Sequence, residues 1–335
     1  MSKVFIGLGG TGIRVLRKLK ELVEERKKIM PEDVAVPPFI LTGIDTEGVH
    51  GLDFNLTLTV HDPADVIEVC WKDGSLKDWW PRNSKGEPYK ITRPIEPGMA
   101  AGGYPMLGRL AFWHNYEKVE NIIEHIKSRA MEFSGATDIF VISSLAGGTG
   151  AGMLMDMGFL LREKFPQAVI FAILLHGEIY QRMAWDALEI THAVLLSVEH
   201  WQKHPESYRM KYLGHSLEGK EGVPPYNLVF LVERENAGGY RFAGTRRGIN
   251  EEYESLVARM LYSMLSRETA IPTNLKSAWQ NQTGSLEVLR ALEEKTGRSM
   301  RYGSFAVAVL EVPYEKAIEY IAGRFVCEKV KPGFH

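Results

Sequence analysis

Two glycine-rich segments carry residue types and spacings that suit phosphate binding. The first, VFIGLGGTGIRVL at residues 4–16, places Gly7, Gly9 and Gly12 in the spacing G-x-G-x-x-G. It follows a short apolar stretch and leads into a helical pattern, so backbone N–H groups and the helix dipole can face an anion. On its own this spacing fits a dinucleotide, a nucleoside triphosphate, or a tight turn without a ligand.

The second segment, SSLAGGTGAGM at residues 143–153, narrows that choice. It sets Gly147, Gly148, Thr149, Gly150 and Gly152 between an apolar strand pattern and a helical pattern. Glycines clear side chains away, so successive N–H groups can surround phosphate oxygens. No Lys-Ser/Thr pair follows the glycines, so this is not a Walker loop. A dinucleotide fold needs no second loop of this kind.

A dinucleotide-binding oxidoreductase remains an alternative hypothesis. Such a fold places an acid about 20 residues beyond the glycines, where it holds the ribose hydroxyls. Asp45 ends the second apolar strand pattern, but it lies 33 residues after Gly12. The spacing therefore disfavours this class of enzyme.

The elements that must position these loops alternate along the chain. Apolar periodicity predicts strands at 4–6, 39–46, 138–144, 168–175, 227–233 and 304–312. It predicts helices at 13–23, 116–133, 181–203, 250–266 and 285–296, another after the second glycine segment, and a last one from residue 314. Residues 49–97 are expected to be irregular, with edge strands. Apolar strands that alternate with helices predict an α/β fold with a parallel sheet covered on both faces, and ligands bind such sheets at the carboxyl ends of the strands.

Composition excludes several function classes. A formal net charge of -2 gives no general attraction to nucleic acid or anionic lipid. The longest apolar run, residues 168–175, is far shorter than the ~18 residues of a membrane span. Cys70 and Cys327 have no metal-ligand spacing and are expected to be reduced. With no signal peptide pattern at the N-terminus, we expect a cytoplasmic protein.

The motifs resemble those of the tubulin/FtsZ superfamily of GTP-binding cytoskeletal proteins, and most of all its divergent bacterial tubulin-like members. AGGTGAG is similar to the signature G-G-G-T-G-[ST]-G, with Ala146 and Ala151 as departures. GLGGTG resembles the first phosphate loop, GIDTEG the second, and AAGGYPMLGR at residues 100–109 the loop that senses the γ-phosphate. These segments follow one another in the family's order.

The resemblance also implies residues for the ribose and the base. Glu178 and Arg182, four residues apart, resemble the ribose loop, although a solvated ion pair also explains them. Asn236 resembles a base-contacting position. Asn250 and Glu251 stand where the family places its guanine-reading residues. Their chemistry suits that role, because an amide can donate to guanine O6 and a carboxylate can accept from N1 and N2. A helix N-cap is the alternative role for Asn250.

The resemblance implies a Rossmann-like GTP-binding domain at residues 1–266, with a long central helix. Residues 267–335 would form a linker loop and the beginning of a second, activation-type α+β domain, which would be incomplete. The expected ligand is GTP or GDP, with Mg²⁺ beside GTP. The expected partner is a second copy of the chain in a head-to-tail filament, with no nucleic acid. The binding residues would be Gly9, Gly10, Thr11, Gly12, Asp45, Thr46, Ala101, Gly102, Gly103, Ala146, Gly147, Gly148, Thr149, Gly150, Glu178, Arg182, Asn236, Asn250 and Glu251.

One part of the family pattern is missing. The family completes GTP hydrolysis with an acid of the motif N-x-D-x-x-D, which acts on the neighbouring subunit. Counting from Asn274 places Lys276 and Trp279 at the acid positions, and counting from Asn281 places Thr283 and Leu286 there. We therefore expect any GTP hydrolysis to be weak or to depend on a subunit interface, and we identify no catalytic residue. A nucleotide-binding scaffold or sensor that does not polymerise is the alternative.

Overall fold

The apolar segments form one parallel sheet in a computed structural model that describes residues 2–29, 38–133, 136–180, 186–233, 248–265 and 302–303. Within those ranges seven strands pair in the order β3-β2-β1-β4-β5-β8-β9, every pair being parallel. Their bounds are β1 Ser2–Leu8, β2 Phe39–Asp45, β3 Phe54–Thr57, β4 Thr137–Ser144, β5 Val169–Leu175, β8 Leu228–Val232 and β9 Tyr302–Gly303. The central strands are buried on both faces, which is why their sequences are apolar without alternation.

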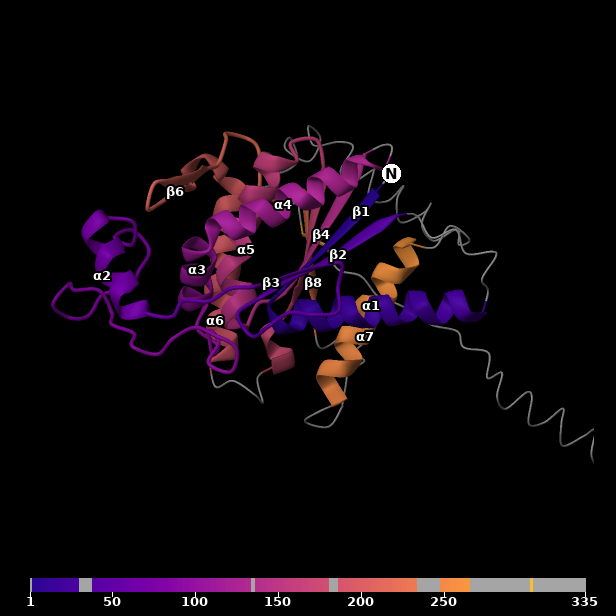
Figure 1. Cartoon of the computed structure of the whole chain (residues 1–335), viewed down its shortest axis with the longest axis horizontal. Helices are drawn as coiled ribbons and strands as arrows, with labels where there is room; N and C mark the ends of the chain where they lie inside the picture. The colour runs from indigo at the N-terminus through magenta and orange to yellow at the C-terminus, as the bar shows by residue number, and fades with distance from the viewer. Residues whose placement is uncertain are drawn as a thin grey trace, which may run out of the picture. The chain divides into compact units, whose positions relative to one another are not determined.

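Helices cover both faces of the sheet (Figure 1). One face carries α1 (Gly9–Ile29) and α7 (Gly248–Leu265), which pack on each other. The opposite face carries α3 (Pro105–His114), α4 (Tyr116–Met131), α5 (Gly148–Lys164) and α6 (Ala187–Lys203). The remaining described elements are α2 (Pro63–Asp73), the 3₁₀ turns η1 (Gly177–Tyr180) and η2 (Pro205–Ser207), and the antiparallel hairpin of β6 (Arg209–Tyr212) and β7 (His215–Glu218).

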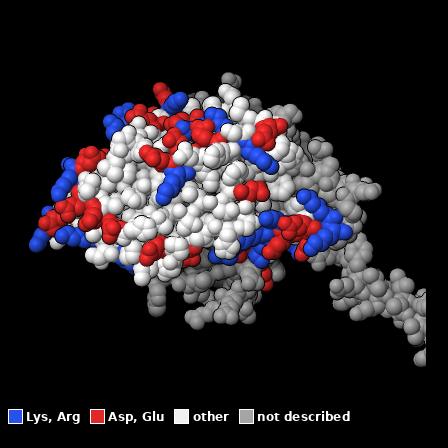
Figure 2. All heavy atoms as spheres, viewed as in Figure 1, with Lys and Arg blue, Asp and Glu red and all other residues white. Residues whose placement is uncertain are grey.

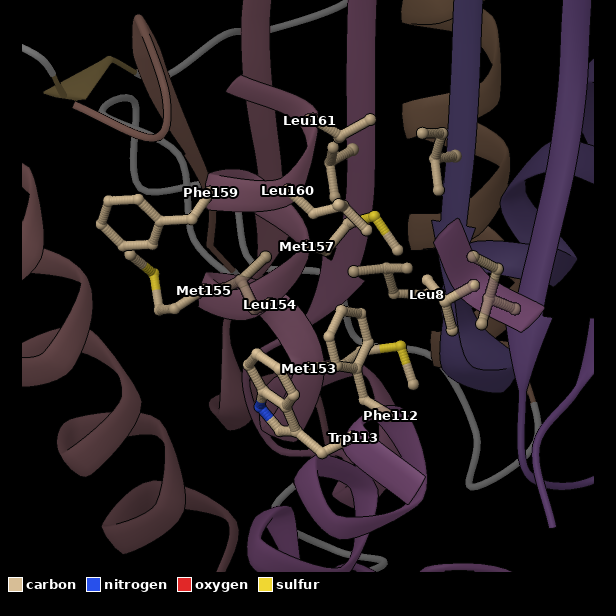
Figure 3. Close-up of a cluster of buried hydrophobic side chains, with 14 of the residues drawn as sticks. Leu8, Phe112, Trp113, Met153, Leu154, Met155, Met157, Phe159, Leu160 and Leu161 are labelled. Carbon is tan, nitrogen blue, oxygen red and sulfur yellow. The ribbon is translucent and has the colours of Figure 1, made fainter. Parts of the chain in front are cut away.

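The sheet separates two apolar layers because neighbouring strand residues point to opposite faces. Val4, Ile6 and Leu8 of β1 belong to the large core under α3, α4 and α5, part of which is drawn in Figure 3. Phe5 points to the face of α1 and stacks on Phe140, with ring centroids 5.0 Å apart. The aromatic row continues along that face, since Phe140 stacks on Phe171 at 4.9 Å.

Most of the expected strands and helices are confirmed, with a few differences. The helix after the second glycine segment was expected to be amphipathic, but all of residues 148–161 of α5 except Gly152 are buried, because the helix lies under both α3 and the sheet. The helix expected at 181–203 is described as α6 from Ala187 onward, because residues 181–185 lie outside the described ranges, and Gly177–Tyr180 before them form the 3₁₀ turn η1. The irregular stretch 49–97 includes edge strand β3 as expected, but also helix α2.

Several predictions fall outside the described residues. These are the boundary at 266/267, the strand at 304–312, and the helices at 285–296 and from 314. They stay predictions.

Charges of both signs are interspersed on the face shown in Figure 2. This agrees with the near-zero net charge and offers no broad single-sign surface there. None of the described helices is both long and apolar enough to cross a membrane.

Candidate functional site: a glycine-lined pocket at the carboxyl end of the sheet

A pocket of about 190 Å³ lies where β1, β2 and β4 end. Four chain segments distant in sequence meet there: the start of α1, the end of β2, the turn before α3, and the start of α5. The lining residues are Leu8, Gly9, Gly10, Thr11, Arg14, Asp45, Glu47, Ala100, Gly102, Gly103, Ser144, Gly147, Gly148, Thr149 and Gly150. Helices α1 and α5 both begin at this pocket, so two sets of helix N-terminal N–H groups can serve one anion.

The first glycine segment has two different physical roles. Gly9 has φ of +69°, a conformation that side chains disfavour, and a Cβ there would lie 2.9 Å from the nitrogen of Gly150. Gly12 faces away from the pocket, and its Cβ would meet the carbonyl oxygen of Ile142 at 2.3 Å. Gly9 therefore lets the two loops touch, whereas Gly12 lets α1 pack on β4.

The second glycine segment is also packed more tightly than its motif suggests. Gly148 and Gly150 line the pocket, and a Cβ on either would collide with neighbouring backbone atoms. At Gly148 it would lie 2.8 Å from the nitrogen of Tyr104, and at Gly150 it would lie 2.6 Å from the carbonyl oxygen of Leu8. Replacing these glycines would displace the neighbouring loops, which differs from the simple blocking of phosphate that the motif alone suggests.

Asp45 and Thr46, at the end of β2, connect the turn before α3 with the start of α5. The hydroxyls of Thr46 and Thr149 share a buried hydrogen bond of 2.7 Å, and the N–H of Ala101 donates to Thr46 Oγ1 at 3.3 Å. The N–H of Thr46 donates to Asp45 Oδ1 at 2.7 Å. Asp45 is only 4% exposed, and this burial raises the pKa of its carboxyl group. Thr46 therefore holds the loops in register, while Asp45 brings a desolvated carboxylate to the pocket.

The segment 100–109 is a loop only in its first half. Gly102 and Gly103 have φ of +58° and +85° and line the pocket, and the N–H of Tyr104 closes a turn by donating to the carbonyl of Ala101. From Pro105 onward the chain is helix α3, because proline suits the first turn of a helix. The expectation of a ten-residue loop was therefore wrong beyond Tyr104.

Arg14 supplies the cation among the described residues that line the pocket, and sequence reasoning missed it. It lies one turn after Gly10 on α1 and lines the pocket. Its Nε donates to Glu254 Oε1 of α7 at 2.7 Å, and the Glu254 side chain is 1% exposed. The signal available in the sequence was the i+4 spacing from Gly10 to Arg14, which places both on one face of α1.

Tyr180 of η1 is a second polar group that the sequence did not single out. It is buried, its hydroxyl forms no well-defined hydrogen bond among the described residues, and Thr11 and Ser144 are close enough to act on its pKa. Burial raises the pKa of Tyr180 to about 12, so the hydroxyl remains a donor at neutral pH.

A family model described as "Tubulin like" matches residues 4–331, nearly the whole chain. The chain belongs to the tubulin-like family. Its strand order and parallel pairing give it the α/β architecture expected of that superfamily.

Solved structures of the superfamily are similar to this tubulin-like chain at low identity. CetZ from Methanosaeta thermophila strain DSM 6194 has 18% identity and a TM-score of 0.48 over 85% of this chain and 61% of its own. An empty FtsZ dimer from M. jannaschii has 12% identity and a TM-score of 0.46 over 79% of this chain and 54% of its own. The chain thus spans less than two-thirds of these structures. Among curated proteins there is no significant match.

The structure of this tubulin-like chain brings together most of the residues expected to bind phosphate. Ala146 is buried beside the second glycine segment without lining the pocket. Glu178 is in η1, which adjoins α7, and it does not line the pocket. Asn250 and Glu251 are in the first turn of α7, which begins at Gly248, so Asn250 is not the N-cap. Arg182, Asn236 and the side chains of Asn250 and Glu251 lie outside the described residues.

Proposed function

We propose that the chain binds a guanine nucleotide, with its phosphates in the glycine pocket, and associates with copies of itself in a nucleotide-dependent way. The observation that carries the proposal is the meeting of three glycine-containing segments, two helix N-termini and a buried carboxylate at one edge of the sheet. Such edges are where ligands bind open α/β sheets.

The size of the pocket supports phosphate binding in particular. Complete small-molecule sites usually have volumes of roughly 300–1,000 Å³, so about 190 Å³ suits the phosphates rather than a whole nucleotide. The ribose and base would then extend beyond it toward η1 and α7, where Glu178, Asn250 and Glu251 are located.

The pocket also fits a magnesium ion held jointly with phosphate. Mg²⁺ prefers oxygen ligands and commonly uses one or two carboxylates together with substrate phosphates. Asp45 lines the pocket beside the hydroxyl of Thr149. No group of three or more His, Cys, Asp or Glu side chains capable of holding a metal occurs in the described part of the chain, so the nucleotide would have to supply the other ligands. Bound there, the ion would neutralise phosphate charge.

Self-association is supported by the family and by the assembly seen in a solved structure of similar fold. CetZ2 from Haloferax volcanii has been solved as a GTPgS-bound protofilament. Hydrolysis in this chain is expected to be weak, because neither Asn274 nor Asn281 is followed by acids at the family spacing. These residues lie outside the described ranges.

Calorimetry with GTP, GDP and ATP in the presence of Mg²⁺ tests the ligand assignment. We expect GTP and GDP to bind at least tenfold more tightly than ATP, since adenine presents a donor where guanine presents the O6 acceptor. Equal affinity for GTP and ATP would overturn the guanine assignment, and no binding of any of them would overturn the proposal as a whole.

A further inference from the structure

A second and larger cavity, of about 490 Å³, lies between α3, α5 and α6. Most of its wall is apolar, with two tryptophans and two methionines. The lining residues are Trp79, Pro105, Met106, Arg109, Ala151, Gly152, Met155, Asp156, Asp186, Glu189, Ile190, Ala193, Val194, Ser197 and Trp201. Its volume falls within the range of small-molecule sites. It shares no lining residue with the glycine pocket.

The inner wall is held in place by a buried ion pair. Nε and Nη2 of Arg109 donate to the carboxylate of Asp156 over 2.9–3.2 Å, and Asp156 is fully buried. Asp156 also accepts hydrogen bonds from Trp113 Nε1 and the hydroxyl of Tyr208. The charge of Arg109 is therefore neutralised within the wall, and its position is set by a rigid network.

The two tryptophans are held by the same arginine. The guanidinium of Arg109 lies 4.9 Å from the ring centroid of Trp79 and 5.7 Å from that of Trp201. The indole N–H of Trp79 donates to the carbonyl of Ser75 at 3.0 Å. Two indoles from distant parts of the sequence are thus fixed in position before any ligand arrives.

The mouth of the cavity is acidic. Asp186 and Glu189, at the start of α6, are exposed and contribute carboxylates to the lining. Since Arg109 is neutralised by Asp156, no free cation balances these two carboxylates among the described residues that line the cavity. An apolar interior with an acidic mouth selects against anions and favours amphipathic cations.

We propose that this cavity binds an organic cation: an aromatic or aliphatic body enters between the indoles and the side chains of α5 and α6, and an ammonium group remains near Asp186 and Glu189. The proposal does not depend on nucleotide binding. An inorganic cation does not suit the site, because the described residues hold no cluster of metal-ligating side chains.

The test uses the whole chain labelled with 5-fluorotryptophan and observed by ¹⁹F NMR. The seven tryptophans give separate probes, and Trp79→Phe and Trp201→Phe assign the two resonances of interest. The probes are 2-(1-naphthyl)ethylammonium, the uncharged 2-(1-naphthyl)ethanol and the anionic 3-(1-naphthyl)propanoate. We expect the ammonium to shift the resonances of Trp79 and Trp201, the alcohol to bind about fivefold more weakly, and the anion more weakly still.

Two kinds of variant distinguish the contribution of the two carboxylates from that of the apolar space inside the cavity. Asp186→Asn combined with Glu189→Gln should weaken ammonium binding about fivefold and leave the alcohol unchanged. Asp65→Asn combined with Glu68→Gln is the matched control, because these exposed acids have the same spacing on α2 and do not line the cavity. Ala193→Trp should abolish binding of both probes by filling the space.

Three results would overturn the proposal. One is the absence of a shift at Trp79 and Trp201 with millimolar ammonium. Another is equal affinity for the three probes, which would show a purely apolar cavity. A third is equal loss of affinity in the α6 and α2 charge variants, which would reduce the effect to overall protein charge.

Discussion

Gly10 and Gly12 stand two residues apart in the first turn of α1 but meet different surroundings. A Cβ on Gly10 would lie in the pocket, 3.0 Å from Nη1 of Arg14 and 3.7 Å from Oδ2 of Asp45. A Cβ on Gly12 would lie 2.3 Å from a backbone oxygen of β4. The first neighbour is the flexible end of a side chain, and the second cannot move without moving the sheet.

We therefore expect opposite outcomes from substitution. Gly10→Val should keep the fold, since valine is no worse than glycine in a helix, but should weaken binding of GTP at least tenfold by occupying phosphate space. Gly12→Ala should lower the free energy of unfolding by about 1–3 kcal/mol through overpacking. Urea unfolding and calorimetry on both variants measure this. A comparable loss of stability in Gly10→Val would show that Gly10 is also a packing residue.

The burial of Asp45 predicts how the stability of the folded protein changes with pH. Because the pKa of the folded carboxyl is raised, the unfolded state ionises more easily, and stability is lost as pH rises through the raised pKa. In the nucleotide-free protein, Asp45→Asn should raise the thermal midpoint at pH 7 and have no effect near pH 3, below the unfolded pKa of about 3.9. A lower midpoint for the variant at pH 7 would contradict this.

The same substitution reports on the proposed metal. Asp45→Asn should also remove most of the difference in GTP affinity measured with Mg²⁺ and with EDTA. If that difference is unchanged, Asp45 does not face the ion, and the raised pKa reflects burial alone.

Helices α1 and α7 are connected at the pocket by Arg14 and Glu254, whose side chains are 46% and 1% exposed. Glu254→Gln should lower the free energy of unfolding by about 1–2 kcal/mol, since a charge-assisted hydrogen bond is lost from a buried position. It should also weaken nucleotide binding, because Arg14 loses the partner that orients it. Exposed Glu252→Gln on the same helix is the control, with an expected effect within about 0.5 kcal/mol. Equal effects in urea unfolding and calorimetry would rule out a specific role for Glu254.

The turn at residues 101–104 is the element best placed to respond to the third phosphate. Two left-handed glycines line the pocket within it, and helix α3 follows directly. Hydrogen exchange at 101–104 should be slower with a non-hydrolysable GTP analogue than with GDP, while α3 beyond Met106 should not differ. Identical exchange in both states would exclude this turn as a γ-phosphate sensor.

At the scale of the whole molecule, assembly and hydrolysis should be separable. We expect GTP to increase light scattering above a threshold protein concentration, while phosphate release stays slow. Loss of a positioned catalytic group commonly costs on the order of 10²–10⁴ in rate, and a lysine such as Lys276 cannot accept a proton from water while it is an ammonium. The nearest carboxylates to this region, Glu268 and Glu287, do not fit the family spacing. Phosphate release that rises steeply with concentration would show that one of them reaches a neighbouring subunit. Scattering that GTP does not change would favour the scaffold alternative.

The sequence by itself determined the order of elements and the chemistry of the loops. Continuous apolar runs such as residues 138–144 are readable as buried strands because a strand covered on both faces needs no polar side. Closely spaced glycines next to such runs indicate loops that approach an anion, and three such segments do line one pocket. These are local properties, set by neighbouring residues.

Only the tertiary structure decided which glycines allow close packing, which leave space for a ligand, and which distant groups complete the site. Gly148 and Gly150 belong to the phosphate motif, yet their missing Cβ atoms make room for Tyr104 and Leu8. Arg14 is an ordinary helix residue until α7 brings Glu254 against it, 240 positions away. The cavity between Trp79 and Trp201 likewise exists only once three helices pack. Contacts of this kind depend on distances between elements, and no spacing along the chain encodes those distances.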